Sequence, residues 1–179
     1  MTLRPTAPRA LAGIGALLLV AGALCGCAPE SEPTPTPTTA FASEEEAFAA
    51  AEEVYQAYTD AVNAERDGDT SADPLSYLVG TALSGSLDTS NKLQEQGWRI
   101  VGDSSVRKFS GRAAELDTTG ATVHANVCLD VSATSVVDSS DANVTPADRP
   151  GLVPLDVEFI GSESGLLITS SDLAEGAGC

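Results

Sequence analysis

The stretch ATVHANVCLDVS, residues 121–132, decides the fold of this chain. One set of alternating positions is apolar: Ala121, Val123, Ala125, Val127, Leu129 and Val131. The positions between them are mostly polar: Thr122, His124, Asn126, Cys128, Asp130 and Ser132. A period of two with one apolar side predicts an antiparallel strand that buries one face and leaves the other in solvent.

Further strands are predicted on both sides of this stretch. Residues 155–159 alternate in the same way, and residues 166–169 form a last short apolar run. Residues 98–116 are expected to hold one bent strand or two. The stretch 138–151 is rich in Ser, Asp and Pro, which indicates a long loop or a hairpin tip.

Helices are predicted before the strands. Ser43 and Glu46 form a capping box, and apolar residues recur at helical spacing to about Glu65. Asp73-Pro74 is expected to open a second helical segment, with Asp73 as its N-cap. Its apolar face is expected to be Leu75, Leu78, Val79 and Ala82. Gly85 and residues 88–91 are expected to divide this segment, and Gly97 to end it.

Helices followed by strands indicate the α+β class, with the helices packed on one face of an antiparallel sheet. Residues 43–179 are expected to form this single domain.

The first 26 residues have the anatomy of a signal peptide. Arg4 and Arg9 precede an uncharged apolar run, Leu11 to Leu24, which is shorter than the roughly 20 residues that span a membrane. The run ends in Leu24-Cys25-Gly26-Cys27, which resembles the lipobox of bacterial lipoproteins. The resemblance implies that residues 1–26 are removed and that Cys27 is acylated. Two acyl chains would hold the protein stably on the extracytoplasmic face of a cell membrane.

Two alternatives to the lipobox stay open: an ordinary cleaved signal peptide and an uncleaved anchor helix. After Cys27, the alternating Pro and Thr of residues 28–42 favour an extended polyproline path, so residues 27–42 are expected to act as a tether.

The charge balance excludes some partners. The chain has 26 acidic and 9 basic residues, for a net charge of −17, and removal of Arg4 and Arg9 leaves −19. Nucleic acid and anionic lipid require clustered cations, so neither is expected as a partner. Four basic residues nevertheless fall close together, as a local positive stripe or as partners for nearby acids: Arg99, Arg107, Lys108 and Arg112.

Cysteine usage agrees with export. If Cys25 is removed and Cys27 acylated, Cys128 and Cys179 remain, and an exported chain allows them one pairing. We therefore expect a Cys128–Cys179 disulfide. His124 is the only histidine in the chain, so no metal site and no cofactor are expected.

The order of elements resembles the nuclear-transport-factor-2-like superfold, which includes ketosteroid isomerase and scytalone dehydratase. The residues that carry the resemblance are the strand 127–132, the turn Asp148-Arg149-Pro150, the strand 166–169 and the terminal 175–179. The resemblance implies a cone-shaped domain, with helices on a curved sheet around a natural cavity. This superfold contains both enzymes and non-enzymes, so it assigns no activity.

An isomerase-type site would need an acid in an apolar cone facing a Tyr or acid donor. The available residues are Asp130, Tyr55, Tyr58 and Tyr77, but Asp130 falls on the polar side of its strand. We therefore expect Asp130 to be exposed or to cap a turn, and the tyrosines to lie in the core. The spacing of residues 67–73 resembles a calcium loop but departs from it at Ala72 and Leu78, which indicates a polar connector.

These patterns predict a membrane-anchored surface lipoprotein with a non-catalytic binding or scaffold domain. The expected partner is a small apolar ligand or an envelope protein. The alternative is a small-molecule isomerase or dehydratase of the cone-shaped superfold.

Overall fold

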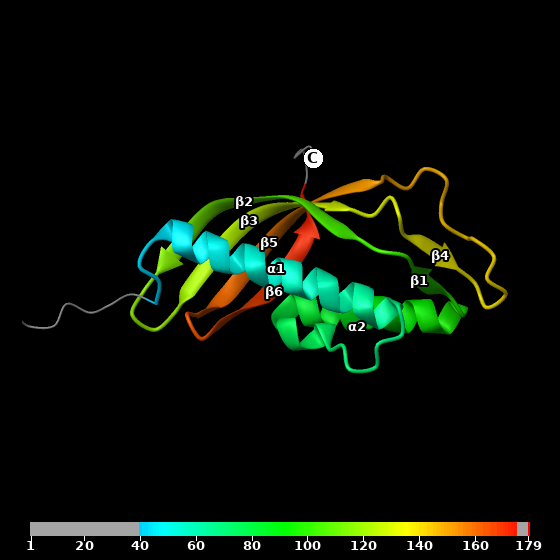
Figure 1. The fold of residues 1–179 in the computed structure, drawn as a ribbon, viewed down its shortest axis with the longest axis horizontal. Helices are drawn as coiled ribbons and strands as arrows, with labels where there is room; N and C mark the ends of the chain where they lie inside the picture. Colours follow the sequence, from blue (N-terminus) through cyan, green and yellow to red (C-terminus); the bar gives the residue numbers. More distant parts are fainter. Residues whose placement is uncertain (1–39, 175–178) are drawn as a thin grey trace, which may run out of the picture. The chain divides into compact units, whose positions relative to one another are not determined.

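The computed structural model describes residues 40–174 and Cys179, and it has the α+β architecture that the sequence predicts (Figure 1). Its helical elements are α1 (Glu44–Arg66), the 3₁₀ helix η1 (Pro74–Tyr77) and α2 (Gly80–Gln96). Its strands are β1 (Arg99–Val101), β2 (Ser105–Leu116), β3 (Ala121–Asp130), β4 (Ser135–Val137), β5 (Leu152–Ser162) and β6 (Gly165–Leu173).

The strands form two antiparallel sheets. The larger has the order β2-β3-β5-β6, and β1 pairs with β4 in a separate two-stranded sheet. The predicted strand region 98–116 is therefore two strands that belong to different sheets. Gly102 lies between them with φ +79°, and a Cβ there would meet the carbonyl oxygen of Ala133 at 2.3 Å, so a side chain does not fit at this bend.

The predicted alternation in β3 is confirmed. Val123, Ala125 and Val127 are at most 2% exposed and face the helices, whereas His124 and Asn126 face outward and are only half-buried. We call the helix-covered side of the large sheet the inner face and the other side the outer face. Phe159 of β5 and Ile168 of β6, both fully buried, complete the inner face.

Helix α1 packs along the inner face over β2 and β3 (Figure 1). Its buried residues recur every fourth position: Ala47, Ala51, Tyr55 and Thr59. As predicted, Ser43 is the N-cap, and its side-chain oxygen accepts a hydrogen bond from the N–H of Glu46 at 3.2 Å. The Glu46 carboxylate in turn accepts from the N–H of Ala42 at 2.8 Å. Phe41, which falls in the expected tether, is 3% exposed and belongs to the core.

The second helical segment differs from the prediction. The break falls at residues 78–79, because Leu78 bridges to Ile168 of β6 and the N–H of Val79 donates to the Ile168 carbonyl at 2.9 Å. Pairing with a strand edge requires an extended backbone, so the helix cannot continue through these residues. Asp73 makes no capping hydrogen bond through its side chain.

Helix α2 then runs without interruption through Gly85 and residues 88–91, where the sequence predicted a division. Gly97 ends it in the left-handed conformation, φ +66°, as predicted. Strand β6 is longer than the predicted 166–169, because its whole length pairs with β5.

Two polar connections fasten the end of the fold that carries β1 and β4. The side chain of Asn63 on α1 donates to the Ser104 carbonyl at 2.8 Å and accepts from the Ser104 N–H at 3.0 Å. The Arg149 guanidinium donates to the carbonyl oxygens of Val131 and Thr134 at 2.9 and 2.6 Å. These bonds satisfy backbone groups in segments that neither sheet pairs.

Several predictions fall outside the described residues. These are the signal peptide 1–26, the acylation of Cys27 and the tether up to residue 39. Within residues 40–174, no helix is long and apolar enough to cross a membrane.

Candidate functional site

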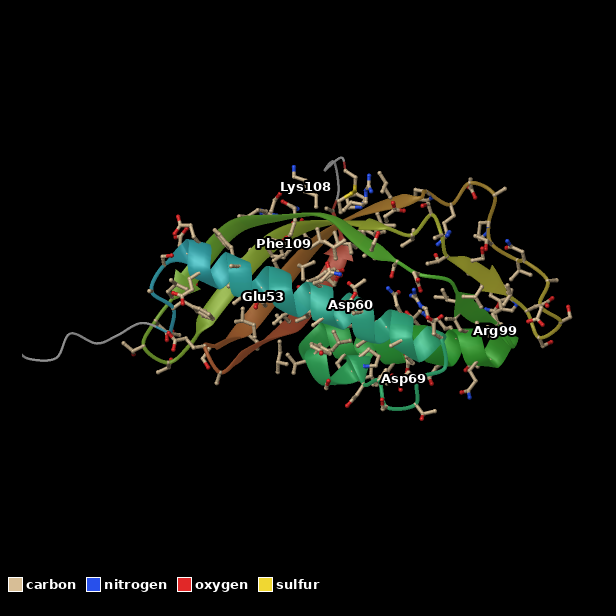
Figure 2. All side chains as sticks on the ribbon, in the orientation of Figure 1. Glu53, Asp60, Asp69, Arg99, Lys108 and Phe109 are labelled. Carbon is tan, nitrogen blue, oxygen red and sulfur yellow. A yellow bond between two sulfur atoms is a disulfide. The ribbon has the colours of Figure 1, made fainter. Side chains whose placement is uncertain are left out.

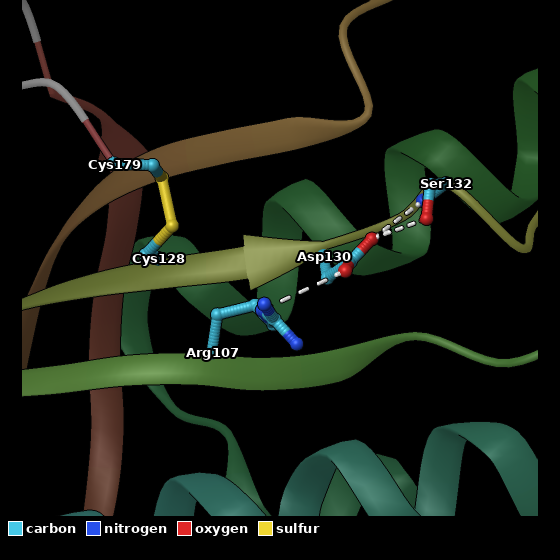
Figure 3. Close-up of a disulfide and its surroundings, with 5 residues drawn as sticks. All are labelled: Arg107, Cys128, Asp130, Ser132 and Cys179. Atoms are coloured by element: carbon cyan, nitrogen blue, oxygen red, sulfur yellow. Dashed lines mark hydrogen bonds and ion pairs between the residues drawn. A yellow bond between two sulfur atoms is a disulfide. The ribbon is translucent and has the colours of Figure 1, made fainter.

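Asp130 lies on the outer face at the end of β3, as the sequence predicts (Figure 3). One carboxylate oxygen accepts from the N–H of Ser132 at 2.9 Å and from its hydroxyl at 2.6 Å, and the other lies 3.8 Å from the Arg107 Nε. The hydrogen bonds from Ser132 and, more weakly, the charge of Arg107 hold the pKa of Asp130 below its usual range. A general base in an apolar cone would have a raised pKa, so this geometry is that of a turn cap.

The three tyrosines lie on the opposite side of the sheet and pack edge to face. The ring centroids of Tyr55 and Tyr58 are 5.9 Å apart, and those of Tyr58 and Tyr77 are 6.5 Å apart. Tyr55 also contacts Phe159 at 6.3 Å. Burial raises the pKa of Tyr55 to about 12, so its phenol stays protonated at neutral pH. Because the sheet separates them from Asp130, these residues do not form one isomerase-type site.

Within residues 40–174, the turn at Asp130 is one of four built on the same local pattern, Asp-x-Ser or Asp-x-Thr. In each, one carboxylate oxygen accepts from both the N–H and the hydroxyl of the residue two positions later: Asp69 with Ser71, Asp117 with Thr119, Asp130 with Ser132, and Asp138 with Ser140. Asp69 belongs to the segment with calcium-like spacing, which is the polar connector that the sequence predicts. The sequence pattern alone does not identify these turn caps, because Asp88-Thr89-Ser90 matches it but lies inside helix α2.

These four turns predict a pH dependence. The pKa of each aspartate lies below its ordinary value of 3.8, chiefly because of the side-chain hydrogen bond from the Ser or Thr. A carboxyl whose pKa is lower in the folded state stabilises the fold above its unfolded pKa, and this stabilisation is lost as pH falls through its folded pKa. We expect the contribution of these four carboxylates to the free energy of unfolding, measured by urea unfolding, to be constant between pH 7 and pH 5. Below about pH 4 it should fall.

A matched pair of variants tests the assignment. Asparagine keeps the acceptor oxygen but cannot take up the proton, so Asp→Asn at all four positions should weaken the stability loss between pH 5 and pH 3. Glu163→Gln, at an exposed position in the β5–β6 turn, should leave the loss unchanged. Equal loss in both variants would contradict the turn-cap assignment.

Most of the basic residues between Arg99 and Arg112 form ion pairs with acidic residues. Arg99 pairs with Asp141, Arg107 with Asp130, and Arg112 with Asp156. Among the described residues, Lys108 has no acidic group within 4.0 Å. Of the two alternatives for the basic stretch, the structure therefore favours partners for nearby acids, with Lys108 as the exception. Figure 2 labels Arg99 and Lys108, which lie on different strands of the stretch, β1 and β2.

A shallow polar hollow of about 240 Å³ lies on the outer face, where β2, β3, β5 and β6 run side by side. Its polar lining residues are Arg112, His124, Asp156, Glu158, Ser170 and Asp172. The Nδ1 of His124 lies 3.8 Å from a Glu158 carboxylate oxygen, and Asp156 accepts from Asn126 at 2.8 Å. No three His, Cys, Asp or Glu side chains among the described residues are arranged to hold a metal ion.

The disulfide between Cys128 and Cys179 is present in the structure (Figure 3). It joins β3 to the last residue of the chain across 51 positions, with the two Cα atoms 5.3 Å apart. Cys128 is 8% exposed although it belongs to the outer face, because Cys179 covers it.

Comparison with known proteins assigns no family. No family model matches the chain, and no curated protein matches it. Among solved structures, the chain is similar to the intermembrane space region of chloroplast protein ARC6, with a TM-score of 0.48 and 20% identity over 70% of this chain and 95% of that chain. A similarity at this level carries no conclusion about function.

Proposed function

We propose that this chain is a lipoprotein anchored through an acylated Cys27 on the extracytoplasmic face of a membrane, with a domain that binds without catalysis. The anchor is supported by the signal-peptide anatomy of residues 1–26 and by the lipobox-like Leu24-Cys25-Gly26-Cys27. The disulfide supports an oxidising compartment, because disulfides persist mainly in exported proteins.

The observation that carries the binding role is an apolar row on the inner face that α1 leaves partly uncovered. In register across the four strands, this row is Phe109, Val127, Leu155 and Leu173. Val127 is 2% exposed beneath the helix, whereas Leu173, at the β6 end, is 73% exposed. The neighbouring row of Val106, Leu129 and Val153 is only half-buried.

An exposed apolar surface continuous with the core fits an apolar ligand or an apolar segment of an envelope protein. The alternative isomerase or dehydratase activity would need an acid on this same face beside the tyrosines. Asp130 is on the other face, and its turn-capping bonds explain its position. We therefore favour binding over catalysis.

The finer fold proposal is the cone-shaped, nuclear-transport-factor-2-like superfold. Its support is the packing of helices on one face together with irregularities that bend strands. Register shifts occur in β2 between Val106 and Lys108 and between Gly111 and Ala113, and in β6 at Thr169, which lies between the partners of Glu158 and Phe159.

Mass spectrometry of the native membrane-extracted polypeptide tests the anchor. The expected result is a mature chain that begins at Cys27 and carries a thioether-linked diacylglyceryl group. A free Cys27 thiol, or an N-terminus cut elsewhere, would contradict the anchor and leave the binding role to be judged separately.

Binding can be tested with the neutral apolar fluorophore N-phenyl-1-naphthylamine and the full chain carrying Cys27→Ser, which removes the lipid attachment site. We expect saturable fluorescence that Leu173→Glu weakens about tenfold or more, because a charge in an apolar contact is costly. Ile160→Glu is the matched control, since Ile160 is 40% exposed on the outer face. Equal effects of the two substitutions, or fluorescence that does not saturate, would refute the proposed surface.

A further inference from the structure

The disulfide lies on the outer face of the sheet and not in the core. The strand neighbours of Cys128, Val127 and Leu129, belong to the inner face, so the Cys128 side chain points away from α1. Cys179 is exposed and Cys128 is 8% exposed. Figure 3 shows the bond above the strand surface, with Cys179 on its outer side. Of the two half-cystines, Cys179 is therefore the one with the larger solvent-exposed surface.

A small recess of about 50 Å³ adjoins the disulfide, and residues of β2, β3 and β5 line it. Its polar lining is Lys108, Ser110 and Asn126, and both cysteines contribute to it. Hydroxyl, amide and ammonium groups are hydrogen-bond donors, and a thiolate accepts from all three. The recess thus places hydrogen-bond donors next to the disulfide.

Lys108 has a particular relation to Cys128, because the two residues are direct partners in the β2–β3 register. Side chains of directly opposed residues share a face, with Cβ atoms about 4.5–5.5 Å apart. Lys108 is also the member of the basic group without an acidic partner among the described residues. No acidic group among the described residues holds the Lys108 ammonium, and its side chain extends from the same face of the sheet as Cys128.

We infer that the Cys128–Cys179 disulfide is a thiol–disulfide exchange site with a defined polarity: an external thiolate attacks Cys179, and Cys128 is the leaving group. A bond forms between the external sulfur and the Cys179 Sγ, and the Cys128–Cys179 bond breaks. Its electron pair stays on Cys128 as a thiolate beside Lys108. The reverse attack by Cys128 expels the external thiolate and restores the disulfide. The external reactant is a small thiol or the dithiol of an oxidoreductase.

The native fold permits this exchange, because the strands around the disulfide are held by other bonds. β6 pairs with β5 from Ser162↔Gly165 to Leu155↔Leu173, and the N–H of Ala174 donates to the Pro154 carbonyl at 3.0 Å. Opening the disulfide therefore releases Cys179 from β3 without unpairing the sheet. This inference depends on neither the lipid anchor nor the apolar surface.

The test uses the native full-length protein and 2-mercaptoethanol, a small thiol that carries no charge other than that of its reactive thiolate. Quenching by alkylation and peptide mass spectrometry locate the adduct and give the rate of opening. We expect the mixed disulfide on Cys179. Lys108→Gln should slow opening about 3- to 10-fold, because a leaving thiol with a higher pKa leaves more slowly. Lys108→Arg should restore most of the rate, and Lys92→Gln on α2 should have no effect.

Circular dichroism of each variant separates loss of the ammonium from loss of the fold. Adducts found mainly on Cys128 would overturn the polarity. An unchanged rate in folded Lys108→Gln would overturn the role of Lys108. Opening that occurs only in urea concentrations that unfold the chain would overturn the exchange site itself.

Discussion

Replacing Phe159 by alanine is expected to lower the free energy of unfolding by about 3–5 kcal/mol. Phe159 is 0% exposed and lies at the centre of the inner face. Its ring is 6.3 Å from that of Tyr55 on α1 and 6.2 Å from that of Phe109 on β2, measured between centroids. Alanine would leave a cavity between helix and sheet that neither neighbour can fill, because both are fixed on rigid elements.

Ile160 provides the matched control, since it is the next residue of the same strand and faces the opposite side. It is 40% exposed, so Ile160→Ala should cost less than about 1 kcal/mol. Urea unfolding of both variants measures the difference. Similar losses at the two positions would mean that the inner face is not the core, and the packing of α1 would have to be reassigned.

Replacing Gly111 by valine is expected to cost at least about 2 kcal/mol, through overpacking and not through a cavity. Gly111 faces α1 from β2, and a Cβ there would lie 2.3–2.6 Å from the nearest ring atoms of Phe48. These are ring atoms close to the helix backbone, so the phenyl group cannot avoid the clash by a small rotation. The helix would have to lift from the sheet or the strand would have to shift.

Two further variants separate this clash from a general intolerance of glycine replacement. Gly85 lies inside α2, and a Cβ added there would have nothing within 4 Å, so Gly85→Ala should raise stability by about 0.5–1 kcal/mol. Adding Phe48→Ala to Gly111→Val should cost less than the sum of the two single changes, because the substitutions share one space. Strict additivity in urea unfolding would show that Phe48 is not the obstacle.

The position of Lys108 opposite Cys128 could not be predicted from the sequence. From the sequence, Cys128 has no cationic neighbour, because Lys108 is 20 positions away. The β2–β3 register places the two residues opposite one another, and the register includes a shift between Val106 and Lys108. A shift of one residue would turn Lys108 to the other face. No local pattern in β2 predicts where this shift falls.

Features that depend on a few neighbouring residues were determined by the sequence alone. They include the Ser43 cap, the Gly97 helix end and the division of β3 into an apolar and a polar side, because each follows from local backbone chemistry or from a period of two. The tertiary structure decided the break at Leu78, the pairing of β1 with β4 and the partner of Cys128 across the sheet. These features depend on which backbone groups, distant in the sequence, form hydrogen bonds with one another. The pairing is fixed only when the whole sheet assembles.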